Sequence, residues 1–235
     1  IDAAKESCEK AQTRIDDWLT ECDYLDAGRE VIDDAARIGV GILKGPTPKK
    51  IRRKAITRAL EGIGLVIKET VNPVSGRISP WNFYPDPNCG EDIQRGKYVF
   101  ERDDITGREL ADLKGMPGYI DYAIEEAMEE GPVNSVVQGE RQKTTTDNRS
   151  DAELYQIWYF HGYLSAGDLD TLGATHGGEG KQYPVICTLV NDKIIKAAMA
   201  PLDSGEFPYD VFVWQKRSGH WAGRSVGRQM RTEQD

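Results

Sequence analysis

The sequence predicts an α+β fold in which amphipathic helices pack on antiparallel strands, and two patterns lead to this prediction. The clearest helical pattern has one apolar face, formed by Ile120, Ala123, Ile124, Ala127 and Met128. The clearest strand pattern is a pair of apolar runs, residues 183–190 and 193–199, on either side of Asn191-Asp192. Two such runs joined by a two-residue turn predict an antiparallel hairpin.

The N-terminal residues carry a heptad stripe in which spacings of four and three residues alternate. The stripe consists of Ala4, Cys8, Ala11, Ile15, Trp18, Cys22 and Leu25. Because Ala and Cys are small, we expect this helix to pack closely on its own domain or on a neighbouring subunit. Gly28 is expected to break or kink the helix.

Residues 30–46, EVIDDAARIGVGILKGP, predict an amphipathic helix that turns into a short strand. Its apolar residues recur at helical spacing, while Asp33 and Asp34 are expected on the opposite face. Gly39 and Gly41 are expected to end the helix, since glycine enters the left-handed conformation without steric cost. Gly45-Pro46 is then expected to end the strand.

The remaining elements follow from shorter signals. A strand is expected at residues 63–71, followed by a turn at Asn72-Pro73 and Ser75-Gly76. The run 81–87, WNFYPDP, should pack its aromatic side chains from an extended backbone, because its prolines exclude regular helix. Thr106 and Glu109 match a capping box at the start of a helix. Strands are expected at residues 98–100, 154–164 and 211–214, and a helix at residues 226–234.

The expected organisation has four parts. A helical and mixed α/β part covers residues 1–132, a flexible polar connection 133–150, an antiparallel β-rich part 151–222, and the start of a helix 223–235. The chain starts and stops in segments with helical character, so we expect sequence to be missing at both ends.

The charge balance disfavours a protein that binds nucleic acid tightly. The chain has 30 Lys and Arg against 39 Asp and Glu, a formal net charge of -9, whereas proteins that grip duplex DNA usually have a basic balance or face. An acidic chain is better suited to a passage through which DNA moves. No apolar run approaches a membrane span and no signal-peptide pattern is present, so neither membrane insertion nor secretion is indicated.

One short run departs from the acidic background. The segment PKKIRRK, residues 48–54, contains the candidate contact residues Lys49, Lys50, Arg52, Arg53 and Lys54. These residues could contact DNA phosphate or an acidic partner surface. The alternative is a solvated loop or helix face. No aromatic residue interrupts the run, so base stacking is not suggested.

Catalytic chemistry has weak support in the sequence. The most plausible alternative to a structural role is a metal-dependent hydrolase or nuclease that uses Glu101, Asp103 or Asp104, although Asp103-Asp104 is expected simply to precede a helix. The segment GVGILKGPT does not have its glycines at the separation that a phosphate-binding loop requires. The histidines show no metal-helix spacing, and His161 and His220 are expected to pack rather than ligate. We therefore assign no catalytic, cofactor-binding or metal-binding residue, and no cofactor.

The four cysteines have no C-x-x-C spacing, so a structural zinc site is not indicated. They are Cys8, Cys22, Cys89 and Cys187. We expect them to be reduced and buried. The acidic residues Glu125, Glu126, Glu129 and Glu130 are expected on the solvated face of their helix.

Five segments in order resemble portal proteins of tailed double-stranded-DNA bacteriophages, particularly the short-tailed phages. They are EVIDDAARIGVGILKGP, WNFYPDP, YVFERDDITGRELADL, VNDKIIKAAMAPLDSGEFPYDVF and GRSVGRQMRTEQ. The resemblance implies mainly the portal wing, with an extension toward the stem or clip.

This resemblance also implies a function. Portal proteins form a ring of identical subunits, usually twelve, at one vertex of the capsid, and DNA passes through the ring during packaging and ejection. The terminase packaging motor docks outside the ring and tail or adaptor proteins later replace it. The resemblance therefore implies a non-enzymatic virion protein, assembled in the host cytoplasm, that contacts duplex DNA without reading its sequence. Another head-tail connector protein is the remaining structural alternative.

Overall fold

The computed structural model describes residues 2–59, 62–133, 154–171, 178, 182–200 and 204–232. Helices and antiparallel sheets occur together, so the fold class is α+β, as the sequence predicts. The chain divides into two compact units, unit 1 (Ile1–Pro80 with Pro208–Asp235) and unit 2 (Trp81–Phe207). These boundaries differ from the expected ones at residues 132, 150 and 222. Residues 134–150 of the expected connection lie outside the described residues.

Unit 1 is discontinuous in sequence because the end of the chain pairs with its first strand. Its elements are α1 (Asp2–Glu21), α2 (Tyr24–Ile38), β1 (Val40–Ala59), β2 (Gly62–Ile78), β8 (Tyr209–Val213), β9 (Gln215–Arg217), β10 (His220–Arg224) and α7 (Val226–Thr232). The strand β1 lies between β2 and β8 in an antiparallel sheet. Val40 lies opposite Val213 and Lys44 opposite Tyr209.

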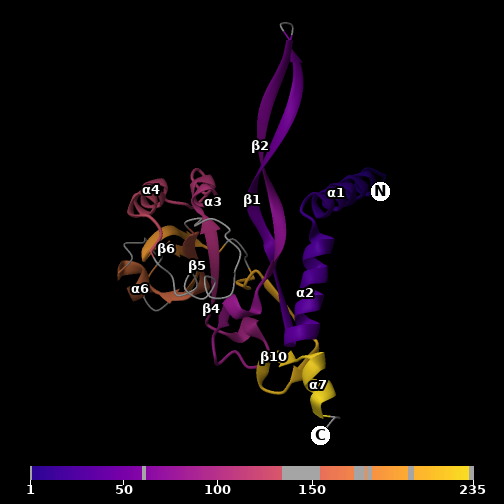
Figure 1. Ribbon diagram of the computed structural model, residues 1–235, viewed down its shortest axis with the longest axis vertical. Helices are drawn as coiled ribbons and strands as arrows, with labels where there is room; N and C mark the ends of the chain where they lie inside the picture. Colours follow the sequence, from indigo (N-terminus) through magenta and orange to yellow (C-terminus); the bar gives the residue numbers. More distant parts are fainter. Residues whose placement is uncertain are drawn as a thin grey trace, which may run out of the picture. The chain divides into compact units, whose positions relative to one another are not determined.

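The junction between α2 and β1 follows the prediction at Gly39. Gly39 has φ 107°, and its N–H donates to the carbonyl oxygen of Ala35 at 2.9 Å, which closes the helix. Gly41 has another role, since it lies in β1 where a Cβ atom would overlap the carbonyl oxygen of Val31. Glycine at this position therefore lets β1 pass close to α2, and the two elements lie side by side in Figure 1.

The expectation that Asp34 faces solvent is wrong. Asp34 is buried, and its carboxylate accepts two hydrogen bonds from the Arg77 guanidinium, at 2.6 Å from Nε and 2.9 Å from Nη2. The hydrogen bonds to Asp34 and its charge raise the pKa of Arg77, against an opposing contribution from burial. The pair joins α2 to β2, so a polar residue on the inner face of α2 holds the helix to the sheet.

The N-terminal helix breaks earlier than expected. The chain turns at Cys22-Asp23, where Asp23 has φ 53°, and Gly28 lies inside α2. The helix α1 is exposed along most of its length, so it does not pack closely on its own domain, and packing on a neighbouring subunit stays a prediction. Most of the apolar stripe of α1 is therefore exposed within the described part of the chain, whereas Trp18 is half-buried.

The turn signals near residues 45 and 72 do not end any strand, and these two predictions are wrong. The strand β1 continues through the cis peptide Gly45-Pro46, with a register shift between Lys44 and Thr47. Asn72-Pro73 and Ser75-Gly76 lie within β2. The backbone ladder of the β1–β2 hairpin extends on both sides of these positions, so pairing between strands outweighs the local turn preference.

Unit 2 contains a five-stranded antiparallel sheet in the order β3-β4-β5-β6-β7. Its elements, besides two short 3₁₀ helices, are β3 (Phe83–Pro85), β4 (Tyr98–Thr106), α3 (Gly107–Asp112), α4 (Asp121–Glu130), β5 (Leu154–Ser165), α6 (Ala166–Thr171), β6 (Gln182–Val190) and β7 (Lys193–Met199). Ile157 packs with Ile124 of α4, while Phe160 packs with Leu169 of α6. Since alternate residues of β5 face opposite sides, both faces of the sheet carry apolar packing.

Several local predictions in unit 2 are confirmed. Thr106 and Glu109 form the capping box of α3. The predicted apolar face of α4 has Ala123, Ile124 and Ala127 buried. The β6–β7 hairpin turns at Asn191 and Asp192, with φ 50° and 62°. Positive φ at both positions matches the right-handed twist of the paired strands.

The aromatic run at residues 81–87 fulfils its prediction only in part. Phe83 is buried, whereas Trp81 is exposed, at 71%. Asp86 is buried beside this run and accepts backbone hydrogen bonds from Lys97 at 3.0 Å and Asn88 at 2.9 Å. These bonds, with that from Lys97 the largest cause, lower the pKa of Asp86. The Asp86 carboxylate therefore holds the two ends of the loop before β4 together through these hydrogen bonds.

The cysteines also fulfil their prediction in part. All four are free thiols; Cys89 and Cys187 are buried, Cys22 is half-buried and Cys8 is exposed. The expectation of burial is thus wrong for Cys8, because α1 packs little against its own chain.

Candidate functional site

The basic run predicted as a contact lies in a strand, so the loop or helix-face interpretation is wrong. Lys49 and Lys50 are opposite Asn72 and Val71 in the β1–β2 register; the same register places Arg52, Arg53 and Lys54 opposite Glu69, Lys68 and Ile67. Successive residues of a strand face opposite sides, so Lys49 and Lys50 lie on the two faces of the hairpin. Lys49 is exposed, and the ammonium of Lys50 lies 3.9 Å from the Glu69 carboxylate.

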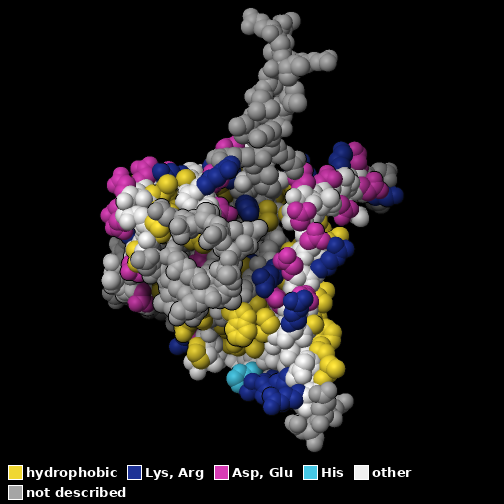
Figure 2. Space-filling model, viewed as in Figure 1, with side chains coloured by type: hydrophobic (Ala, Val, Ile, Leu, Met, Phe, Trp, Pro, Cys, Tyr) yellow, Lys and Arg dark blue, Asp and Glu magenta, His cyan; other side chains and the backbone are white. Residues whose placement is uncertain are grey.

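A second basic group, which we did not identify in the sequence, lies at the end of unit 1. Its members are Lys216, Arg217, Arg224, Arg228 and Arg231, which we name the C-terminal basic surface. All five are exposed, and residues 211–232 contain no Asp or Glu. Figure 2 shows dark-blue side chains over the β9–β10 hairpin. Within the described residues, no carboxylate pairs with Lys216, Arg217 or Arg224. A count over this longer window would have revealed the group.

Close backbone contacts position this surface beside the C-terminal end of α2. The N–H of Trp214 donates to the carbonyl oxygen of Gly39 at 3.2 Å. A Cβ atom at Gly223 would overlap the side chain of Val213 and lie 2.5 Å from the carbonyl oxygen of Gln215. The amide of Gln229 in α7 also donates to the side chain of Gln215 at 2.6 Å. The elements β8, β9, β10 and α7 are thereby held together.

The opposite charge gathers on α1 and α2. Residues 1–34 contain eleven Asp or Glu against four Lys or Arg. The exposed carboxylates that have no ion-pair partner among the described residues are Glu9, Asp16, Asp17, Asp23 and Glu30, which we name the N-terminal acidic surface. Other acids in this region are paired, as Glu6 is with Lys10 at 2.7 Å. Figure 2 shows acidic side chains along this part of unit 1.

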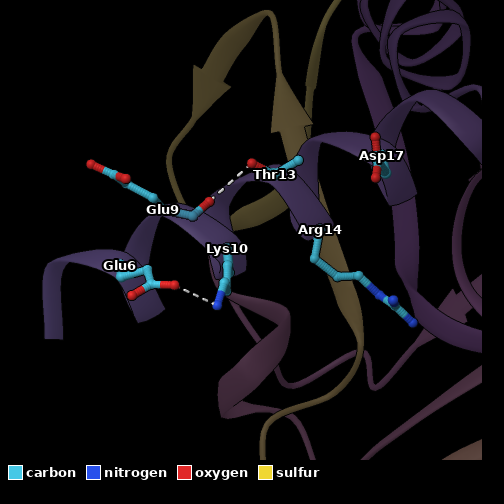
Figure 3. Close-up of a pocket in the computed structure, with 6 residues that line it drawn as sticks. All are labelled: Glu6, Glu9, Lys10, Thr13, Arg14 and Asp17. Carbon is cyan, nitrogen blue, oxygen red and sulfur yellow. Dashed lines mark hydrogen bonds and ion pairs between the residues drawn. The ribbon is translucent and has the colours of Figure 1, made fainter. Parts of the chain in front are cut away.

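A shallow depression runs along the acidic surface of α1. It is lined by Glu6, Glu9, Lys10, Thr13, Arg14 and Asp17. Figure 3 shows all six side chains projecting from a single helix, with the ion pair between Glu6 and Lys10 and the bond from the Thr13 hydroxyl to the carbonyl oxygen of Glu9. Because one helix supplies every lining residue, the depression resembles a docking face more than a pocket that encloses a small molecule.

Apolar residues accompany both charged surfaces. Ile15 and Leu19 of α1 are 51% and 40% exposed. Beside the C-terminal basic surface, Phe212, Trp214 and Met230 are 47%, 45% and 59% exposed. Apolar side chains next to charges are typical of surfaces that bind another protein.

The acids of the hydrolase alternative do not assemble into a cluster. Glu101, Asp103 and Asp104 all lie in β4, and the two aspartates precede α3, which begins at Gly107. Strand alternation places Asp104 on the face opposite Glu101 and Asp103. Glu101 is buried and lies opposite Tyr159 in the register, and burial raises the pKa of Tyr159 well above its usual range. Across the described ranges, no group of three metal-ligating side chains occurs.

The other polar groups singled out in the sequence have packing or surface positions. Glu126 and Glu130 on α4 both contact the ammonium of Lys193, at 2.7 and 2.6 Å. His161 is buried in β5 and His220 is exposed in β10. His176 and most of the glycine-rich loop at residues 173–180 lie outside the described residues.

Comparisons with known proteins add no assignment. Among the described helices, none has the length and apolar composition that crossing a bilayer requires. No protein-family model matches the chain, and no curated protein matches it.

Proposed function

We propose that this chain is part of a portal protein, a structural subunit of the ring through which DNA enters and leaves a phage capsid. The observation that carries the proposal is the placement of the resembling segments. Residues 30–46 form the end of α2 and the start of β1, residues 209–212 belong to β8, and residues 226–232 form α7. These three parts are far apart in sequence, yet they belong to the same compact unit.

Exposed apolar side chains support a subunit of an assembly. Ile15 and Leu19 on α1, and Phe212, Trp214 and Met230 near the chain end, are all more than one-third exposed. A protein that works as a monomer rarely leaves two such groups uncovered. Contacts with identical neighbours in a ring would cover them. We take twelve copies, the usual number in portal proteins, as the proposed ring size.

The charge balance supports a channel through which DNA moves without tight binding. A net charge of -9 disfavours a continuous array of phosphate contacts, so duplex DNA would move along the ring without sequence-specific binding. The proposal assigns no bond-making or bond-breaking step to this chain. The capsid, the terminase motor and later the tail or adaptor proteins are its proposed partners, in the virion.

Sedimentation velocity and negative-stain microscopy of the purified protein test the proposal. We expect a particle whose mass is many times the 26.2 kDa of one chain, about twelve times for the proposed ring. Images should show rings with a central hole. A stable monomer that turns over a substrate would refute the proposal.

A further inference from the structure

The basic surface of unit 1 and most of its acidic surface lie toward opposite ends of one helix, α2. The N-terminal acidic surface lies on α1 and α2, and α1 joins the start of α2 at Cys22-Asp23. The C-terminal basic surface lies beside the other end of α2, where Trp214 bonds to Gly39 (Figure 1). The 15 residues of α2 span roughly 22 Å at 1.5 Å per residue. The carboxylates of α1 and the cations of β9 therefore cannot pair within one chain.

The composition of the two surfaces favours a protein partner over a nucleic acid. Both combine exposed charges with exposed apolar residues, as protein interfaces combine an apolar centre with a charged rim. Binding to a phosphate backbone would use the cations but would leave Phe212, Trp214 and Met230 without a role. The acidic surface of another copy supplies carboxylates together with Ile15 and Leu19.

We propose that the N-terminal acidic surface of one copy docks on the C-terminal basic surface of the next copy, head to tail. This inference rests on the proposed function, because it names the faces through which ring subunits would meet. A contact between two different faces leaves one free face at each end of a growing chain of subunits. Such a contact closes into a ring when the rotation between neighbours permits it.

Complementary charge reversals provide the test. One variant carries Asp16→Lys and Asp17→Lys, which changes the formal charge of residues 6–17 from -2 to +2. The second carries Lys216→Glu and Arg217→Glu, which changes the formal charge of residues 215–224 from +3 to -1. All four side chains are exposed, so circular dichroism should show the fold of the unaltered protein. A control variant reverses the exposed Glu129 and Arg108, which lie in unit 2, outside both surfaces.

Each variant alone should assemble poorly, with association weakened at least about tenfold, because like charges then face each other. An equimolar mixture of the two variants should assemble again, since every contact in an alternating ring pairs opposite charges. The control should assemble like the unaltered protein. Sedimentation velocity at low and high salt measures all of these states.

Three results would overturn the inference. If both variants form rings as readily as the unaltered protein, the faces are wrong while the portal proposal stands. If the mixture remains unassembled, the two surfaces do not meet. The third result is that the unaltered protein does not assemble, that it binds a short DNA duplex, and that Lys216→Glu and Arg217→Glu abolish this binding. In that case the basic surface is a nucleic-acid contact, and the portal proposal also fails.

Discussion

Removing the carboxylate of Asp34 should loosen α2 from the sheet of unit 1. In Asp34→Ala the Arg77 guanidinium loses both of its hydrogen bonds to the helix, at 2.6 and 2.9 Å. The exposed pair between Asp33 and Arg37 on the same helix provides a matched control, because its side chains are 53% and 75% exposed.

The expected magnitude follows from burial. Removing one partner of a fully buried ion pair costs about 3–5 kcal/mol. The Arg77 side chain is 33% exposed, so water can solvate the guanidinium that remains, and we expect a loss of about 2 kcal/mol. For Asp33→Ala the loss should be about 0.3–0.5 kcal/mol, the usual value for exposed helix pairs. The two neighbouring aspartates should therefore differ severalfold.

Hydrogen exchange measured by mass spectrometry is the suitable assay, because it reports the opening free energy of α2 without requiring that both units unfold together. A double-mutant cycle with Arg77→Met should give a coupling free energy of about 1–3 kcal/mol between Asp34 and Arg77. If the amides of α2 are as well protected from exchange in Asp34→Ala as in Asp33→Ala, the pair of Asp34 and Arg77 does not hold the helix and the argument is wrong.

Three further predictions concern single side chains. Gly41→Ala should unfold unit 1, since the added Cβ would overlap the carbonyl oxygen of Val31. Gly28→Ala has open space around it and should stabilise α2 by about 0.5–1 kcal/mol. Thermal melting of the two variants compares these effects. Thr106→Ala should destabilise α3 by about 1 kcal/mol, and Thr106→Ser should restore most of this in urea unfolding. The pKa of Asp86 is lowered in the folded protein, so its charged carboxylate stabilises the folded state. This contribution is complete well above the unfolded pKa of about 3.9, and it is lost as the pH falls through the lower pKa of the folded state. Acid unfolding of Asp86→Asn should therefore show a weaker pH dependence than that of the unaltered protein.

The elements that the sequence predicts correctly are those with strong local signals. The left-handed glycine at the end of α2, the capping box at Thr106 and the Asn191-Asp192 turn each depend on a few adjacent residues. Such signals act through the backbone within one or two turns of chain, so sequence spacing contains most of the needed information.

The errors arise where a distant segment decides the local structure. Gly45-Pro46 and Asn72-Pro73 are typical turn pairs, yet each lies in a long strand because its partner strand continues past it. Asp34 resembles a solvent-facing acid until Arg77, 43 residues later, is placed beside it. The pairing of β1 with β8 joins residues more than 160 positions apart, and no local pattern encodes it.

The candidate surfaces were missed for a related reason. The segment PKKIRRK stands out in the sequence because its charges are adjacent, and the structure places it within the long strand β1. The residues of the C-terminal basic surface are spread over 16 positions and two kinds of element, from Lys216 to Arg231. They become one surface only because β9, β10 and α7 fold back on one another.

Residues that appear purely structural therefore control the angle between the two charged surfaces. Gly39 closes α2, and its close approach to Gly223 fixes the β10 side of that junction. Asp34 and Arg77 hold the middle of α2 to β2. In a head-to-tail contact, the angle between the two faces of one copy decides whether successive copies close into a ring or continue as a filament. On the proposed contact, the junction of α2 and the sheet is thus where the sequence of one chain sets the geometry of the assembly.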